Sequence, residues 1–207
     1  MASPGLKIVT DRLEVWSPEP EAAAEVASYY VRNREHHRPW DPPRPEGFET
    51  EGYWRDRLER ARAEQAEGAA VRLFLAEKAA APQILGAINF TGITRGPFQA
   101  CRVGYSLDLA AVGRGLMSEA LRAAIAHMFE HEGLHRVEAN YVPTNERSGR
   151  LLRRLGFLVE GYARDYLFVG GAWRDHVLTS LTSADGASPC DRTVSPCDCR
   201  LKSSRSP

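Results

Sequence analysis

Hydrophobic and polar positions follow two different periods on either side of a glycine-containing turn in the middle of the chain. Residues 101–109 alternate apolar and polar side chains, which is typical of a half-buried strand. Residues 116–132 repeat apolar side chains at helical spacing. Gly113 and Gly115 stand between them, and a ligand can approach the backbone there because glycine has no β-carbon. A strand, a glycine turn and a helix start together predict an anion site, most naturally for a phosphate.

The patterning elsewhere predicts an alternation of strands and helices. We expect strands over residues 7–16, 69–78, 84–91, 135–142, about 162–169 and 173–181, and helices over 21–33, 50–67 and from Thr144 or Asn145 to Leu155. Three consecutive strands with short connections favour an antiparallel meander before the central helix. Gly170 and Gly171 predict a two-residue hairpin turn between the last two strands.

Two further segments carry structural expectations. Residues 34–48 contain four prolines and two adjacent histidines, so we expect an irregular and exposed segment. In the charged helix over 50–67, the expected buried face consists of Tyr53, Leu58 and Ala61.

The length and composition predict one globular domain over residues 1–182, followed by a disordered tail over 183–207. The chain has 207 residues, of which 43% are hydrophobic and 26% charged. The tail carries only two aliphatic residues beyond alanine, which is too few to bury a core. Neither a membrane-length apolar run nor a signal core is visible, so we expect a cytoplasmic protein with no membrane partner.

Charge and cysteine content add little chemistry. The formal net charge is zero and gives no strong nucleic-acid signal. Three of the four cysteines, Cys190, Cys197 and Cys199, lie in the tail without a nearby histidine, so free thiols are the preferred interpretation and no metal site is predicted.

The glycine turn itself fits neither common nucleotide motif. It lacks the lysine of a Walker loop, and Ser118 stands at the third glycine of a dinucleotide fingerprint. A simple tight connection is the alternative. However, the sequence YSLDLAAVGRGLMSEAL resembles the acetyl-coenzyme A loop of the GNAT N-acetyltransferase superfamily. The pattern of that loop is [Gln/Arg]-x-x-G-x-[Gly/Ala], and Gly115 takes the place of its central glycine. Val112 and Met117 depart from that pattern, which removes one side-chain contact and narrows the space at the helix start.

A second group, Asn145 and Ser148, stands at the start of the short helix. The structural alternative is a helix cap followed by an ordinary serine. If the strand over 135–142 runs beside the strand over 101–109, this helix starts next to the glycine turn. The GNAT resemblance then implies that Asn145 bonds the pantetheine amides and that Ser148 protonates the leaving thiolate.

Five residues are candidates for a general base, and the sequence favours none of them. They are Glu77, Asp108, Glu138, His36 and His37. An α-amino group has a pKa near ~8 and is already partly neutral at cellular pH, so water-mediated proton transfer can suffice. Aromatic and basic residues around Trp40 and Tyr53 favour an acceptor-binding wall over plain solvated surface, with RNA contact as a third reading.

Several longer stretches resemble the RimJ-type branch of GNAT enzymes, which acetylate the N-terminal alanine of a ribosomal protein. They are TDRLEV at 10–15, NREHHRPWDP at 33–42, VGYSLDL with GLMSEAL at 103–121, ANYVPTNERSGRLLRRLGF at 139–157 and EGYARDYLFVGGAWRDHVLTSL at 160–181. The resemblance implies an α+β fold, with a mixed and mostly antiparallel sheet flanked by helices. It also implies acetyl-CoA as co-substrate and a ribosomal protein N-terminus, free or on the ribosome, as acceptor.

The same resemblance implies a set of site residues. Backbone contacts to the cofactor are expected from Ser106, Leu107 and Leu109, and a pyrophosphate cradle from Gly113, Arg114, Gly115 and Leu116. The acceptor is expected against His37, Trp40, Tyr105 and Tyr141. Two other functions stay open: a small-molecule N-acetyltransferase with the same cofactor site, and a non-enzymatic ribosome-assembly factor that keeps the fold.

Overall fold

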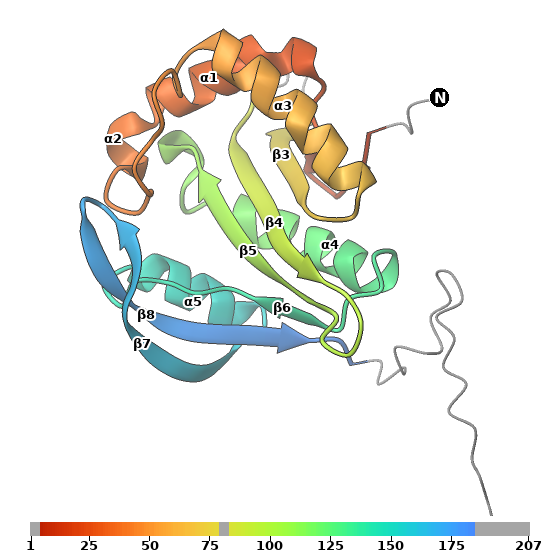
Figure 1. Cartoon of the computed structure of the whole chain (residues 1–207), viewed down its shortest axis with the longest axis vertical. Coiled ribbons are helices and arrows are strands. Elements are labelled where there is room, and N and C mark those ends of the chain that lie inside the picture. The colour runs from red at the N-terminus through yellow and green to blue at the C-terminus, as the bar shows by residue number, and fades with distance from the viewer. Residues whose placement is uncertain (1–4, 79–82, 185–207) are drawn as a thin grey trace, which may run out of the picture.

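The computed structural model describes residues 5–78 and 83–184 as an eight-stranded sheet with helices on both faces (Figure 1). The strand order is β1-β2-β3-β4-β5-β6-β8-β7, and every neighbouring pair is antiparallel except β5 with β6. The strands are β1 Lys7–Val9, β2 Leu13–Trp16, β3 Val71–Glu77, β4 Gly86–Thr94, β5 Ala100–Leu107, β6 Arg136–Glu138, β7 Leu158–Val169 and β8 Ala172–Thr182. The helices are α1 Ala23–Arg32, α2 Arg34–His37, α3 Glu51–Ala66, α4 Leu116–Glu130 and α5 Glu146–Arg154, with short 3-10 turns at Pro20–Ala22 and Leu109–Ala111.

This architecture confirms the predicted α+β fold and the antiparallel meander of β3, β4 and β5. The Gly170-Gly171 hairpin is also confirmed, because Val169 pairs with Ala172 across it. The tail predicted over 183–207 lies outside the described residues from 185 onward.

Three local predictions were wrong. The single strand over 7–16 is a hairpin of two strands, because the Thr10 amide donates to the Leu13 carbonyl at 2.9 Å and turns the chain back. Residues 34–37 form a helical turn in which His37 is buried, so this part of the 34–48 segment is neither irregular nor fully exposed. In α3, Leu58 is buried as predicted, but the other buried residue is Trp54, whereas Tyr53 and Ala61 are only partly covered.

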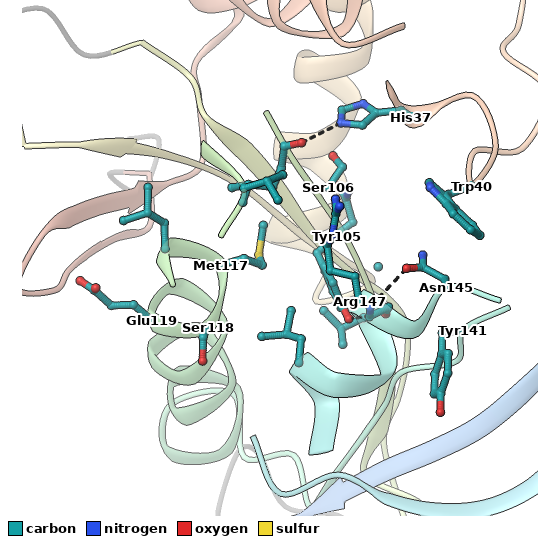
Figure 2. A pocket seen from close by; sticks show the side chains of 18 of the residues that line it. His37, Trp40, Tyr105, Ser106, Met117, Ser118, Glu119, Tyr141, Asn145 and Arg147 are labelled. Carbon is teal, nitrogen blue, oxygen red and sulfur yellow. Dashed lines mark hydrogen bonds between the residues drawn. The ribbon is translucent and has the colours of Figure 1, made fainter. Parts of the chain in front are cut away.

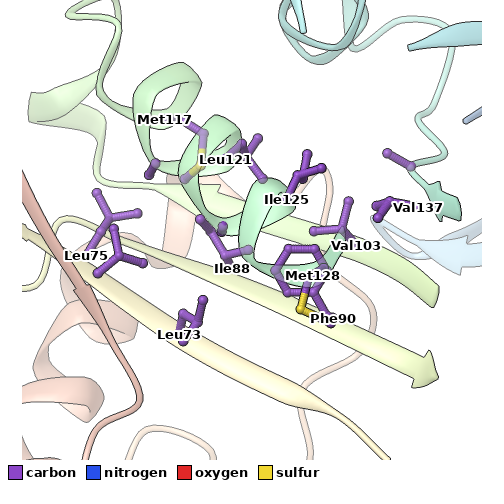
Figure 3. Packing of buried hydrophobic residues seen from close by; sticks show 14 of the residues in the cluster. Leu73, Leu75, Ile88, Phe90, Val103, Met117, Leu121, Ile125, Met128 and Val137 are labelled. Carbon is purple, nitrogen blue, oxygen red and sulfur yellow. The ribbon is translucent and has the colours of Figure 1, made fainter. Parts of the chain in front are cut away.

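Two apolar layers hold the sheet between the helices. On one face, α4 packs onto β2 to β5 through side chains at helical spacing, among them Met117, Leu121, Ile125 and Met128 (Figure 3). On the other face, α1 and α3 cover a smaller cluster that includes Phe74 and Ala87. Because alternate strand residues face the two layers, β3 is apolar and buried without interruption from Leu73 to Ala76.

The sheet splits between its two parallel strands. β5 and β6 pair only from Ala100 opposite Arg136 to Arg102 opposite Glu138. Beyond that point β5 stays with β4 as far as Leu107, while Ala139 donates to Thr179 of β8 at 3.0 Å. The two halves therefore diverge into a wedge, visible in Figure 1 as the separating ribbons of β5 and β8. The strand expected over 135–142 is therefore shorter than predicted, and among the described residues no strand pairs with this side of β5 beyond Arg102.

Candidate active site

A cavity of about 1240 Å³ fills the wedge at the carboxyl end of β5 (Figure 2). Its walls are β5, the start of α4, the first turns of α5, and the segment from α2 to Asp41. In Figure 2, His37 and Trp40 lie on one side of Tyr105 and Ser106, whereas Ser118 and Glu119 lie on the other. The cavity therefore links the glycine turn to the aromatic segment past the middle of β5.

Most of the predicted site residues line this one cavity. They are His37, Trp40, Tyr105, Ser106, Leu107, Gly113, Gly115, Leu116, Tyr141, Asn145 and Ser148. Two do not line it. Leu109 is 61% exposed, and its amide donates to Asn33 Oδ1 at 3.0 Å. The Arg114 guanidinium is ion-paired with Glu77.

The unpaired edge of β5 offers backbone donors to the cavity. The Asp108 amide donates to the Leu85 carbonyl at 2.7 Å, on the β4 side. Backbone groups of a strand alternate in direction, so the amides of Tyr105 and Leu107 point away from β4 and into the wedge. The Leu107 carbonyl follows the same direction, since His37 Nε2 lies 3.0 Å from it. Ser106, by contrast, directs its amide toward β4 and reaches the cavity with its side chain.

The glycine turn presents the start of α4 to the cavity. Gly115 is the N-cap residue in a left-handed conformation, with φ of 79°, and no side chain caps the helix. The amides of Leu116, Met117 and Ser118 belong to the first turn, where no intrahelical acceptor exists. These residues line the cavity, so the turn can accept an anion.

Glu119, in the first turn of α4, was missed by sequence reasoning. Its carboxylate accepts from Thr10 Oγ1 at 2.6 Å, from the Arg12 amide at 2.9 Å and from Arg12 Nε at 2.7 Å. Burial alone would raise the pKa of Glu119, but these hydrogen bonds outweigh it and lower the pKa. This contact connects the β1–β2 hairpin to the start of α4. The positive charge of Arg12 balances the negative charge of Glu119 beside the place where an anion would bind.

Asn145 and Ser148 line the cavity from the start of α5, where Ser148 contacts β5. Asn145 Oδ1 accepts from the Ser148 amide at 3.2 Å, so Asn145 is the N-cap of α5. Its side-chain NH₂ has no hydrogen-bond partner within the described residues. Ser148 Oγ lies 2.7 Å from Tyr105 Oη. Burial raises the pKa of Tyr105 to about 12, so the phenol keeps its proton at neutral pH.

His37 and Trp40 border the end of the cavity that lies opposite the glycine turn. His37 is 4% exposed and donates from Nε2 to the Leu107 carbonyl, because a carbonyl can only accept. Its Nδ1 is buried and has no partner in the described part of the chain. Trp40 is 39% exposed at the mouth. Arg147, which sequence reasoning also missed, lines the same mouth from α5.

The five candidates for a general base separate by position. His36 and His37 line the cavity. Glu77 is ion-paired with Arg114, Glu138 is paired with Arg136 at 3.0 Å, and Asp108 is held by Arg32 at 2.7 Å. Within residues 5–78 and 83–184, no group of three or more His, Cys, Asp or Glu side chains could hold a metal ion.

A mixed sheet that splits at the end of a central strand, beside a glycine-led helix start, is the architecture that the GNAT resemblance predicted. The chain belongs to the GNAT acetyltransferase family, whose domain model matches residues 12–158. It is an acetyltransferase. It is 44% identical to the [ribosomal protein uS5]-alanine N-acetyltransferase of Escherichia coli (strain K12) over 182 residues, covering 88% of this chain and 93% of that relative.

Solved structures show the same likeness. The ribosomal-protein-S5-alanine acetyltransferase from Vibrio fischeri superposes with a TM-score of 0.84 and 37% identity, covering 88% of this chain and 100% of the other. Mycobacterium smegmatis RimJ, solved in complex with CoA-disulfide, gives a TM-score of 0.78 at 26% identity, with 87% of each chain covered. No helix in the described parts of the chain is long and apolar enough to span a membrane.

Proposed function

We propose that the protein transfers the acetyl group of acetyl-CoA to the N-terminal amine of a ribosomal protein that begins with alanine. The names and extensive coverage of the uS5-alanine relatives support this acceptor. The observation that carries the proposal is the continuous cavity, which joins an anion-accepting helix start to an aromatic mouth past Ser148. We further propose that residues 1–182 form the catalytic domain and that the reaction takes place in the cytoplasm.

In this proposal the cofactor lies along the unpaired edge of β5. Acetyl-CoA supplies a thioester, whose carbonyl carbon is open to attack and whose thiolate can leave. The pyrophosphate lies against Gly113, Gly115 and Leu116, where glycine backbone and free amides meet. The amides of Tyr105 and Leu107 face the pantetheine and the thioester carbonyl, where a donor stabilises the charge that develops on oxygen. The free NH₂ of Asn145 completes the set of donors.

The reaction proceeds by direct attack in a ternary complex. The neutral amine nitrogen forms a bond to the carbonyl carbon, the carbon–sulfur bond breaks, and the amine loses its extra proton to water. Ser148 donates its hydroxyl proton to the departing sulfur and is reprotonated from solvent. Because Tyr105 keeps its proton, it can donate to Ser148 Oγ, and in this proposal it does so, which leaves the serine hydrogen free to point at sulfur. Tyr105 is thereby a positioning residue for Ser148.

The amine needs no strong base. An α-amino group has a pKa near ~8, so a useful fraction is neutral at physiological pH. His37, Trp40 and Tyr141 border the acceptor channel in this proposal. The proton leaves through water at the mouth, which is open at Trp40.

A thermal-shift and thiol-release experiment tests the proposal. Acetyl-CoA at ~100 times its dissociation constant should stabilise the protein by roughly 2.7 kcal/mol. Adding an alanine-starting peptide should then release free thiol, whereas the same peptide with a blocked N-terminus should not. A shift with turnover of small amines alone would indicate a small-molecule acetyltransferase. Failure of acetyl-CoA to bind, together with salt-sensitive ribosome binding, would indicate an assembly factor and overturn the proposal.

A further inference from the structure

We infer that the acceptor carries an acidic side chain within a few residues of its reacting amine, and that Arg147 binds this side chain. The inference rests on the proposed function, because it concerns a peptide entering the mouth of the same cavity. It assigns a specificity-determining role to a residue in the first turn of α5, beside Ser148.

The guanidinium of Arg147 has no carboxylate partner among the described residues. It lines the cavity, and it forms no ion pair within the described residues. Its sequence neighbour Glu146 is already paired with Arg150 at 2.8 Å on the outside of the helix. Arg122 and Arg154 also line the cavity without a carboxylate, but they lie further along α4 and α5.

Arg147 lines the cavity together with His36, which belongs to α2 on the acceptor side. The charge of Arg147 also contributes to the lowered pKa of His36. Burial lowers the pKa of His36 first, and the neighbouring His37 and Arg147 lower it further, with only Asp108 acting in the opposite direction. Two segments far apart in the sequence therefore meet at one electropositive mouth.

The carboxylates around this mouth are already committed to other partners. Asp41 is paired with Arg44 at 3.1 Å, and Glu35 with Arg38 at 3.3 Å. Asp108 accepts from Arg32 at 2.7 Å and from Asn33 at 3.0 Å. The positive charge of Arg147 is thus left for a group that arrives with the ligand.

This charge would discriminate between acceptors. A carboxylate just behind the amine gains a charge-assisted hydrogen bond, whereas a lysine there is repelled. Since Arg147 is exposed, the discrimination is that of a solvated ion pair, about fivefold in kcat/KM for one position.

A peptide series tests the inference. Alanine-starting peptides carry glutamate, glutamine or lysine at the second, third or fourth position, one position at a time, and thiol release gives kcat/KM. We expect at least one position at which glutamate exceeds lysine about fivefold or more. Arg147→Gln should abolish that preference, and Arg147→Glu should reverse it. Arg150→Gln is the matched control, because Arg150 lies on the same helix and pairs outward with Glu146.

The outcomes separate the inference from the proposed function. If the unmodified enzyme turns over none of the peptides, the proposed function fails. If it turns over all of them without regard to charge, the function stands and the inference is overturned. A rise in the KM for acetyl-CoA in Arg147→Gln, equal for all peptides, would also overturn it by placing Arg147 on the cofactor.

Discussion

The contact between Ser148 and Tyr105 leads to a prediction about the leaving group. Their oxygens lie 2.7 Å apart, and burial raises the pKa of Tyr105 to about 12. Tyr105 is therefore protonated across the working range and acts through Ser148. We expect Ser148→Ala to lower kcat by removing the acid, and Tyr105→Phe to lower it less, because the hydroxyl is only less well oriented.

The expected magnitudes follow from the chemistry of the thiol. A positioned acid contributes roughly 10²- to 10⁴-fold in general, but a thiol with a pKa near ~8.5 leaves readily and belongs at the low end. We expect about a 100-fold loss for Ser148→Ala near neutral pH, shrinking as the pH rises through ~8.5 and the thiolate no longer needs a proton. One neutral hydrogen bond is worth ~1 kcal/mol, which predicts about a fivefold loss for Tyr105→Phe.

A double-mutant cycle in the thiol-release assay decides whether the two residues form one unit. The double variant should be no slower than Ser148→Ala alone, because Tyr105 has nothing left to orient. Saturating acetyl-CoA and a pH series from 6.5 to 9.5 separate kcat from binding. Losses that multiply in the double variant, or a Ser148→Ala defect that does not depend on pH, would refute the role of Ser148 as acid.

Three further variants test the frame around the site. Gly115→Ala should weaken acetyl-CoA binding and cost ~1 kcal/mol of stability at its φ of 79°. Gly171→Ala, at φ of 81° and not among the residues that line the cavity, should cost similar stability and leave acetyl-CoA binding intact. Thermal shifts with and without ligand distinguish the two variants. Gly86→Ala would bring a β-carbon to 2.7 Å from the Ser106 carbonyl oxygen, so urea unfolding should show a free energy of unfolding lower by about 2 kcal/mol or more. Gly104→Ala, where the space is open, is the control and should change the free energy of unfolding little. Burial alone would raise the pKa of Asp108, but hydrogen bonds with Asn33, Ala110 and Arg32 outweigh burial and lower this pKa. The ionised Asp108 therefore stabilises the fold fully above the unfolded pKa of ~3.9. This stabilisation is lost as the pH falls toward the lower pKa of the folded state. Asp108→Asn should therefore reduce stability at neutral pH and flatten the acid side of a stability–pH curve, and a curve unchanged in shape would contradict this.

Sequence patterning predicted the elements whose signals are local. The alternation in β5, the helical spacing in α4 and the Gly170-Gly171 turn each depend on neighbouring residues, and each is confirmed. The glycine turn before α4 was predictable for the same reason, since glycine conformation and a helix start are properties of a few consecutive residues. That this turn accepts an anion stays a prediction.

Distant contacts determined the features that patterning missed. The turn at Thr10 owes its shape to Leu13 and to Glu119, a residue on another element. Trp54 is buried because its ring stacks on Tyr30 at 4.6 Å and its indole donates to Phe48, which no helical pattern in α3 reveals. Glu119 and Arg147 carry no motif, so only their neighbours in space identify them.

The clearest case is Asn33, because this one buried amide connects the two halves of the site. It is 1% exposed, and its side chain donates to the Tyr29 carbonyl and to Asp108 while accepting from the Leu109 amide at 3.0 Å. The bend that ends β5, and so aims the glycine turn at the cavity, is thereby fastened to the helix that leads into His37. A polar group this deeply buried is costly unless all its hydrogen bonds are made, so the bend and the acceptor wall hold their geometry together or lose it together. An asparagine between two short helices gives no sign of this in the sequence, where it reads as an ordinary helix end.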